Sequence, residues 1–280
     1  MGKFTGVLLA SDFDNTLIYT EEALRTGAPV PPLPERNRKA LAYFMAQGGR
    51  FAVSTGRALA AFLKYVDLVP MNAPGVVCNG AALYDFQTGE YLETALLDQL
   101  ALERGQAVLD RFPEAAVEAY HIGNVIHAVH PNEFTRRHEH LTKVGVTEAP
   151  SLTEVPLPLG KLLFEAEHST LADIVAFLRE QGWAGDYELI FSGQTLLEMT
   201  VKGANKGGMV CRLAERLGIS MDHLYCAGDE ANDISMLTAA REGFAPANSV
   251  PAVRECGATI VCDAREGALA DVIEILDRRY

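Results

Sequence analysis

Short apolar runs alternate with helical patterns at both ends of this chain, and that alternation constrains its fold more than any other feature. Near the N-terminus, apolar runs at 6–11, 50–55 and 75–80 predict strands, and the segments 35–49 and 57–66 predict helices. Strands and helices that alternate in this way are typical of a parallel sheet with helices packed on its faces. We therefore expect an α/β fold.

The same alternation returns near the C-terminus. Helices are expected at 205–218, 232–240 and 267–279, and strands at 224–229 and 258–262. The two ends of the sequence therefore predict one sheet between them, and the segment that separates them has to leave this sheet and return.

The middle of the chain, from about 84 to 202, has a different pattern. Its apolar runs alternate polar and apolar residues, as half-exposed antiparallel strands do. We interpret it as an α+β domain inserted into the α/β core, which makes the core discontinuous: residues 1–83 and 203–280 form the core and residues 84–202 the insertion. Within the insertion, strands are expected at 124–130, 161–167, 187–193 and 196–202, and helices at 98–112 and 169–182.

Charge and composition exclude several kinds of partner. The 280 residues include 24 Lys and Arg against 37 Asp and Glu, a net charge of −13. That balance argues against nucleic acid and against an anionic membrane, because contacts with phosphate need clustered basic residues. No apolar run is long enough to span a bilayer, and five scattered cysteines are typical of a reduced, cytoplasmic protein. We expect a monomer or a weak homodimer.

Polar side chains gather where the predicted strands of the core end. Ligands of open parallel sheets bind beyond the carboxyl ends of the strands, and hydroxyls, helix N-termini and a lysine in this place are suited to an anion. Clustered carboxylates there have the opposite effect. The residues concerned are Asp12 and Asp14 after the first strand, Thr55 and Gly56 after the second, Lys206 at a helix start, and Asp229, Asn232 and Asp233 after 224–227.

Carboxylates and an anionic ligand are compatible at one site only if a cation lies between them. Two like charges ~4 Å apart repel by ~4 kcal/mol at an effective dielectric constant of about 20. Mg²⁺ prefers oxygen ligands and binds through a few carboxylates together with a phosphate of the substrate. The sequence therefore predicts a Mg²⁺ site that receives a phosphate group.

Four short segments in this order resemble the motifs of the haloacid dehalogenase superfamily, and among its members the Cof-type hydrolases. They are DFDNT at 12–16, STGR at 54–57, GANKGG at 203–208 and GDEAND at 228–233. The resemblance spans nearly the whole chain. It implies a Rossmann-like core with a large inserted cap domain, and an enzyme that hydrolyses small phosphorylated metabolites, such as sugar phosphates or similar phosphomonoesters.

The resemblance also implies a role for each site residue. Asp12 is expected to be the nucleophile that forms an aspartyl-phosphate, and Asp14 the general acid and base. Thr55, Gly56, Lys206 and Asn232 are expected to bind the phosphoryl group. Mg²⁺ is expected to bind Asp12, the backbone carbonyl of Asp14 and Asp229, with Asp233 holding the metal or its bound waters from behind.

Several alternatives stay open in the sequence. Asp12 and Asp14 alone could be an ordinary strand-end turn, and Arg57 could bind phosphate or an acidic residue. Glu230 adds a negative charge near the mouth of the site. Five histidines of the insertion lack the spacing of a zinc site and are expected to be solvated or hydrogen-bonded. The alternative functions are a phosphomutase of the phosphomannomutase type and a sensor of phosphorylated metabolites without turnover.

Overall fold

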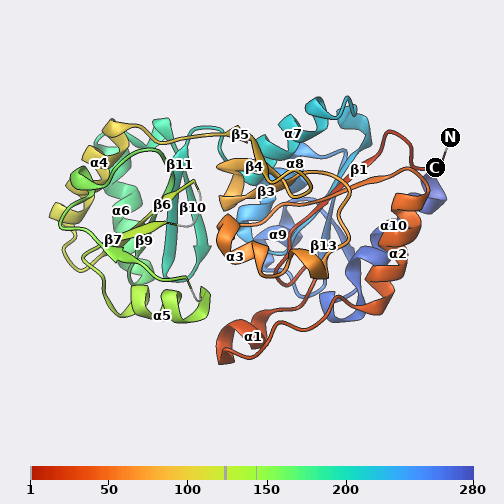
Figure 1. Ribbon diagram of the computed structural model, residues 1–280, viewed down its shortest axis with the longest axis horizontal. Helices are drawn as coiled ribbons and strands as arrows, with labels where there is room; N and C mark the ends of the chain where they lie inside the picture. The colour runs from red at the N-terminus through yellow and green to blue at the C-terminus, as the bar shows by residue number, and fades with distance from the viewer. Residues whose placement is uncertain (1, 123–124, 143) are drawn as a thin grey trace.

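A computed structural model describes residues 2–122, 125–142 and 144–280. The chain forms two lobes, which lie side by side in Figure 1, and each lobe is built around its own sheet. The larger sheet of the right-hand lobe uses strands from both ends of the sequence, as expected. This arrangement confirms the predicted α/β core with an additional α+β unit.

Five parallel strands make the sheet of the first lobe, in the order β14-β13-β12-β1-β2. The strand β1 is entirely buried, because it has a neighbour on either side and helices over both faces. Its C-terminal end therefore lies between the ends of β12 and β2. The strands are β1 (Leu8–Ser11), β2 (Arg50–Val53), β12 (Leu224–Ala227), β13 (Glu242–Pro246) and β14 (Thr259–Val261).

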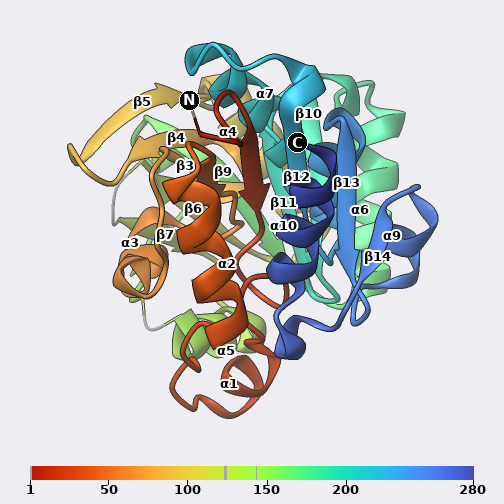
Figure 2. The ribbon, with the colours of Figure 1, turned by 90° about the vertical axis from the view of Figure 1, so that its right-hand side faces the viewer.

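Alternate residues of β1 belong to two different hydrophobic cores. Leu9 packs in the core that includes residues of α2 (Glu35–Ala46) and α10 (Ala268–Arg279), which lie together on one face of the sheet in Figure 2. Leu8 packs in the core that includes residues of α7 (Lys206–Arg216) and α8 (Ile234–Ala239). Helices thus cover both faces and leave the strand ends as the place for a site.

The third predicted strand, at 75–80, was assigned to the wrong sheet. β3 (Gly75–Val77) pairs antiparallel with β4 (Ala82–Asp85), which pairs with β5 (Glu90–Thr94). Only a single bridge, between Ser54 and Val76, joins β3 to the end of β2. The cause is the turn after β3, where Cys78 and Asn79 adopt positive φ angles of 52° and 53° and reverse the chain.

Six strands form the sheet of the second lobe, in the order β10-β11-β9-β6-β7-β8. All neighbours are antiparallel except β7 and β8. The helices α4 (Gln99–Arg111) and α6 (His168–Glu180) share the hydrophobic core on one face. The strands are β6 (Ala116–His121), β7 (Ile126–Val129), β8 (Thr147–Glu148), β9 (Leu159–Glu165), β10 (Tyr187–Gly193) and β11 (Leu196–Val201).

The predicted strands and helices of this lobe are found, and besides the two-residue strand β8, two elements were missed. Residue 124, at the start of the strand expected at 124–130, lies outside the described residues. The missed elements are β6 and α5 (Glu133–Thr142), the helix at the lower edge of this lobe in Figure 1. Three further short helices belong to the first lobe: α1 (Glu21–Thr26), α3 (Leu59–Leu63) and α9 (Pro251–Glu255).

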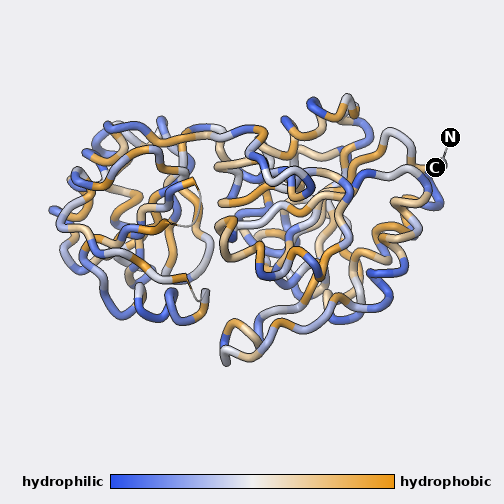
Figure 3. Tube along the Cα trace, in the orientation of Figure 1, coloured by the Kyte–Doolittle hydropathy of each residue, from blue (hydrophilic) through white to orange (hydrophobic). Residues whose placement is uncertain are grey.

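Hydrophobic segments follow the strands in the interior of both lobes, and hydrophilic segments lie mainly on the outward helices (Figure 3). Separate groups of buried residues form the cores of the two lobes. In the part of the chain that the structure describes, every helix is too short or too polar to cross a lipid bilayer. The domain boundaries at 83/84 and 202/203 stay a prediction.

Candidate active site

The ends of three neighbouring strands bring the predicted residues to one place. Asp12 directly follows β1, Thr55 lies two residues after β2, and Asp229 lies two residues after β12. Asp12 and Asp229 are 5% and 3% exposed and Thr55 is fully buried. The shared sheet edge, rather than proximity in sequence, thus gathers the carboxylates, as the parallel topology predicts.

Lys206 lies at the centre of this group and is only 1% exposed. Its Nζ donates hydrogen bonds to Oδ1 of Asp12 and to Oδ1 of Asp233, each at 2.6 Å. Asn205 caps the N-terminus of α7 by accepting a hydrogen bond from the Gly208 N–H, which fixes the start of the helix that carries the lysine. Burial acts to lower the pKa of Lys206, but the charges of Asp12 and Asp233 outweigh it and raise this pKa, so the lysine stays charged.

The charged forms of two of the carboxyl groups are destabilised, because the site contains too little positive charge. The pKa of Asp12 is raised to about 8 by burial, which Lys206 only partly offsets, and then by the charges of Asp233 and Asp14. Burial, Asp12 and Asp233 raise the pKa of Asp229 well above its ordinary value. Three carboxylates face one ammonium group, so two negative charges are left over. A divalent cation balances both.

The donor atoms fit such a cation. Carboxylate oxygens of Asp12, Asp229 and Asp233 lie within 4.8 Å of one another, and all three residues are buried. Asp229 is held in place by the Thr16 hydroxyl, which donates to its Oδ1 at 2.7 Å. Asp233 accepts hydrogen bonds from the backbone N–H groups of Asp229 and Glu230 through Oδ2. An all-oxygen donor set with anchored carboxylates is what Mg²⁺ prefers.

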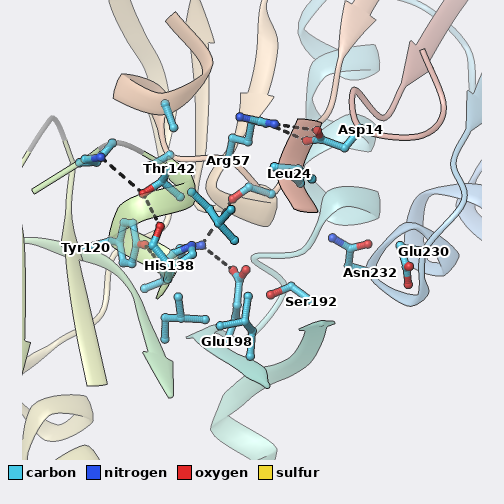
Figure 4. Close-up of a pocket in the computed structure, with 18 of the residues that line it drawn as sticks. Asp14, Leu24, Arg57, Tyr120, His138, Thr142, Ser192, Glu198, Glu230 and Asn232 are labelled. Atoms are coloured by element: carbon cyan, nitrogen blue, oxygen red, sulfur yellow. Dashed lines mark hydrogen bonds and ion pairs between the residues drawn. The ribbon is translucent and has the colours of Figure 1, made fainter. Parts of the chain in front are cut away.

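Asp14 lies beside this group, and its partner is Arg57 (Figure 4). Nε of Arg57 donates to Oδ2 and Nη2 donates to Oδ1, both at 2.7 Å, and the Thr20 hydroxyl donates to Oδ1 at 2.6 Å. The guanidinium also lies over the rings of Phe13 and Tyr65. Burial acts to raise the pKa of Asp14, but the charge and hydrogen bonds of Arg57 outweigh it and hold this pKa below its ordinary value. Of the two partners considered for Arg57, the structure shows the acidic one.

Apart from Lys206, the residues expected to bind the phosphoryl group form a second cluster. The Thr55 hydroxyl accepts a hydrogen bond from the Arg57 N–H at 3.1 Å, and the Thr55 N–H donates to the Val76 carbonyl at 2.9 Å. The helix expected from residue 57 begins only at Leu59. The backbone of Thr55 and Arg57 forms hydrogen bonds with Val76 and Cys78 instead of helical ones. Nδ2 of Asn232 donates to Oδ1 of Asn79 at 2.9 Å.

Asn79 is a site residue that sequence reasoning missed. It is fully buried in a left-handed conformation, and its side-chain amide is close to Gly56. Nδ2 of Asn79 and Oδ1 of Asn232 are both buried without a hydrogen-bond partner. These two atoms are therefore available to hydrogen-bond a ligand. None of the four motifs singled out in the sequence includes Asn79, so its role depends on the fold.

One cavity of about 370 Å³ connects this cluster with the second lobe. Asp12, Gly56 and Lys206 line it on one side, and residues of β6, β9, β11 and α5 line it on the other. Figure 4 shows Asn232 and Glu230 on one side of the cavity, across from Ser192 and Glu198. The second wall contains a buried ion pair, in which Nζ of Lys161 lies 2.9 Å from Oε2 of Glu198. Aliphatic side chains, among them Ile126, Leu141, Leu163 and Leu196, complete this wall.

Comparison with known proteins gives a consistent result. The sequence profile of the haloacid dehalogenase-like hydrolases matches residues 9–273. The chain is 24% identical over 275 residues to the pyridoxal phosphate phosphatase YbhA of Escherichia coli, covering 95% of this chain and 97% of that protein. It is also 24% identical over 266 residues to the 5-amino-6-(5-phospho-D-ribitylamino)uracil phosphatase YcsE of Bacillus subtilis, covering 95% and 94% of the two chains.

The fold has a close counterpart among solved structures. The structure of the HAD subclass IIB sugar phosphatase BT4131 superposes with a TM-score of 0.79 at 18% sequence identity, covering 97% of this chain and 99% of that one. At this identity the likeness concerns the arrangement of the elements, including the second lobe.

Proposed function

The chain belongs to the haloacid dehalogenase-like hydrolases of the Cof type and is a phosphatase, and we propose that it hydrolyses small phosphorylated metabolites with Mg²⁺ through an aspartyl-phosphate on Asp12. The observation that carries this proposal is the position of Asp12. It lies at the inner end of the cavity, with Lys206 on Oδ1 and with Asp229 and Asp233 beside it. A buried nucleophile next to a fixed cation is suited to phosphoryl transfer.

Asp12, Asp229 and the backbone carbonyl of Asp14 would hold the metal, with Asp233 behind them. When bound, Mg²⁺ supplies the positive charge that lets a phosphate dianion approach these carboxylates. The chain supplies the remaining cation itself, since Lys206 is charged and oriented by two hydrogen bonds.

The proposed reaction has two steps. A carboxylate oxygen of Asp12 forms a bond to phosphorus while the bond between phosphorus and the ester oxygen breaks, and Asp14 donates its proton to the departing alkoxide. Water then attacks phosphorus, Asp14 accepts a proton from that water, and the bond to Asp12 breaks to release phosphate. Thr55, Gly56 and Asn232 would hold the phosphoryl oxygens through both steps, and the unpartnered amide atoms of Asn79 and Asn232 support this.

Asp14 has to leave Arg57, at least in part, to carry a proton. In the structure both of its oxygens accept hydrogen bonds from the guanidinium. We infer that a bound substrate loosens this pair, because the leaving oxygen offers Asp14 a competing partner. General acid–base catalysis of this kind typically contributes 10²–10⁴-fold.

We further propose that residues 84–202 are a cap that selects substrates for a core formed by 1–83 and 203–280. The cavity supports this, because residues of the second lobe form the wall opposite Asp12.

Sugar phosphates or similar phosphomonoesters are the proposed substrates. The five cysteines have no disulfide partner among the described residues, which agrees with a cytoplasmic location, and a monomer or weak homodimer is proposed.

Metal dependence tests this function. Chelation with EDTA should abolish the release of phosphate from p-nitrophenyl phosphate, and Mg²⁺ should restore it, because three carboxylates cannot accept a phosphate without a cation. A panel of phosphorylated metabolites assayed in parallel would identify the substrate. Undiminished turnover by thoroughly chelated enzyme would contradict the proposed site.

A further inference from the structure

The second lobe contains a buried acidic cluster that the phosphatase reaction does not use. Its members are Glu118 on β6, His138 on α5 and Glu165 on β9. Glu118 is 1% exposed and Glu165 is fully buried. Among the described residues, only this group and the catalytic carboxylates bring three His, Cys, Asp or Glu ligand atoms within 4.8 Å of one another.

Strand register explains why these side chains meet. Glu118 pairs with Leu163 and Ala116 pairs with Glu165 across β6 and β9, so Glu118 and Glu165 lie on the same face of the sheet. The neighbouring residues of each strand, such as Val117 and Phe164, point to the opposite face and enter the core under α4 and α6. The acidic residues therefore occupy the face that α5 covers.

Glu165 is the decisive residue. The side chain is fully buried, and neither carboxylate oxygen has a partner with good hydrogen-bond geometry, although the Thr135 side chain lies close enough to favour the charged form weakly. Its Oε1 lies 3.4 Å from Nδ1 of His138, and the same Nδ1 lies 2.9 Å from Oε2 of Glu118. A buried carboxylate is costly unless a charge or hydrogen bonds compensate it, so this cluster is suited to a cation.

The charge count indicates what the occupant is. Lys161, on the same face, is paired with Glu198 at 2.9 Å, so its charge is already matched. Glu118 and Glu165 leave two negative charges, and a protonated His138 could cancel only one. A divalent ion bound to a neutral imidazole cancels both.

We propose that Glu118, His138 and Glu165 bind a divalent transition-metal ion of the zinc class in the second lobe. One imidazole nitrogen and two carboxylate oxygens are ligands that such ions accept, and they leave room for a water molecule. The Tyr120 hydroxyl, which donates to Oε2 of Glu118 at 2.5 Å, orients that ligand. The site is separate from the phosphatase reaction and does not depend on it.

The ion would fasten α5 to the sheet. Thr135 is the only buried residue of this helix among those described, so little apolar packing holds it. His138, labelled in Figure 4, nevertheless lines the cavity. Leu141 from the same helix lines it as well. A metal bound at His138 links α5 to β6 and β9 and so fixes one wall of the cavity.

Protons are the competing occupant. Burial and the nearby charge of Glu118 raise the pKa of Glu165 to about 7. The carboxylates of Glu118 and Glu165 raise the pKa of His138 against the effect of burial. A proton on each of these two residues would also neutralise the cluster. The two alternatives can be distinguished because bound metal, unlike bound protons, can be measured as the amount of zinc per chain.

Zinc analysis on the full-length chain tests the proposal. Metal-free protein is incubated with Zn²⁺ and excess Mg²⁺, freed of unbound metal, and analysed for zinc per chain. We expect Glu165→Gln and His138→Gln to bind one zinc fewer than the wild type. His168→Gln, which changes an exposed histidine of the same lobe, should bind as much as the wild type. Asp229→Asn, which alters the catalytic cluster, should retain the zinc bound in the second lobe.

Hydrogen exchange supplies a readout that does not depend on the Glu165 variant folding. In wild type and in Asp229→Asn, Zn²⁺ should slow exchange at residues 133–142 of α5. Equal zinc content in wild type, Glu165→Gln and His138→Gln would overturn the proposal, as would unchanged exchange of α5 on adding Zn²⁺. Either result would assign the cluster to protons, and neither would bear on the phosphatase reaction.

Discussion

The residues that contact Asp12 and Asp14 give these two aspartates different pKa values and so suit them to different roles. Asp12 is held by Lys206 and has a pKa raised to about 8, chiefly by burial, whereas Arg57 holds the pKa of Asp14 below its ordinary value. The two carboxyl groups are only two residues apart in the sequence. Their environments differ because the strand ends at Ser11 and the following turn, with Asn15 at a φ of 54°, directs Asp14 toward Arg57.

Replacing Arg57 by Met should raise the pKa of Asp14, because the opposing charge is lost while a side chain of similar length still packs against Phe13 and Tyr65. A protonated Asp14 then persists to higher pH. With an unactivated alkyl phosphate, whose leaving group needs a proton, the alkaline limb of the pH profile of kcat/KM should move to higher pH. With p-nitrophenyl phosphate, whose leaving group needs none, this limb should stay in place. An equal shift for both esters would contradict the role of Asp14 as general acid.

Elements, rather than residues, explain which features could be predicted. Most strands and helices of the core were predicted because apolar runs and helical periods alternate clearly there, but the strand β13 and the short helices α1 and α9 were missed. β6 was missed because five successive residues, Glu118 among them, are buried, so its pattern lacks the usual alternation. α5 was missed because only Thr135 of the described residues in it is buried, which leaves no apolar stripe to detect.

Sequence reasoning could predict only those site residues that the order of the parallel strands brings together. Parallel strands end at one edge, so Asp12, Thr55 and Asp229 could be expected together. The pairing of Arg57 with Asp14, the orphaned amide of Asn79 and the Lys161–Glu198 pair depend on contacts between distant segments. Local sequence patterns carry no information about such contacts.

The packing of α7 against α8 positions Lys206 and gives an element-level prediction. A Cβ on Gly207 would lie 2.2 Å from the Ser235 carbonyl oxygen, so Gly207→Ala should push the two helices apart. Overpacking of this kind typically costs about 1–3 kcal/mol. We expect this loss in urea unfolding, together with lower phosphatase activity because Lys206 shifts. Gly185→Ala, where a Cβ meets nothing within 4 Å, should change neither quantity. A Gly207→Ala variant as stable and active as wild type would show that this contact does not position the lysine.

The molecule as a whole makes the cavity, since neither lobe encloses it alone. Nζ of Lys161 reaches the Gly56 carbonyl at 3.4 Å, so a residue of the second lobe contacts the loop proposed to bind phosphate. The same lysine is paired with Glu198 at the cavity wall. Substrate choice and phosphoryl transfer are thus proposed to meet at one boundary between the lobes.

Replacing both members of this pair, as Lys161→Met with Glu198→Met, should separate selectivity from chemistry. Exchanging a buried ion pair for apolar residues of similar volume is often neutral for stability. Turnover of p-nitrophenyl phosphate should change little, while kcat/KM for the preferred metabolite should fall by about 10-fold or more, as expected for a lost polar contact of ~1.4 kcal/mol or more. The matched control is Lys202→Met with Glu188→Gln, an ion pair whose lysine is exposed. If the ranking of metabolites survives in the first double variant, the pair does not select substrates.

Trapping the phosphorylated enzyme tests the central claim, that Asp12 is the nucleophile and Asp14 its proton carrier. Asp12→Asn and Asp14→Asn are each mixed with p-nitrophenyl phosphate and Mg²⁺, quenched rapidly in acid and weighed by mass spectrometry. Asp14→Asn should accumulate one phosphoryl group per chain, because the activated ester still phosphorylates Asp12 while the attacking water lacks its base. Asp12→Asn should show none. Equal defects without added mass in either variant would contradict covalent catalysis at Asp12.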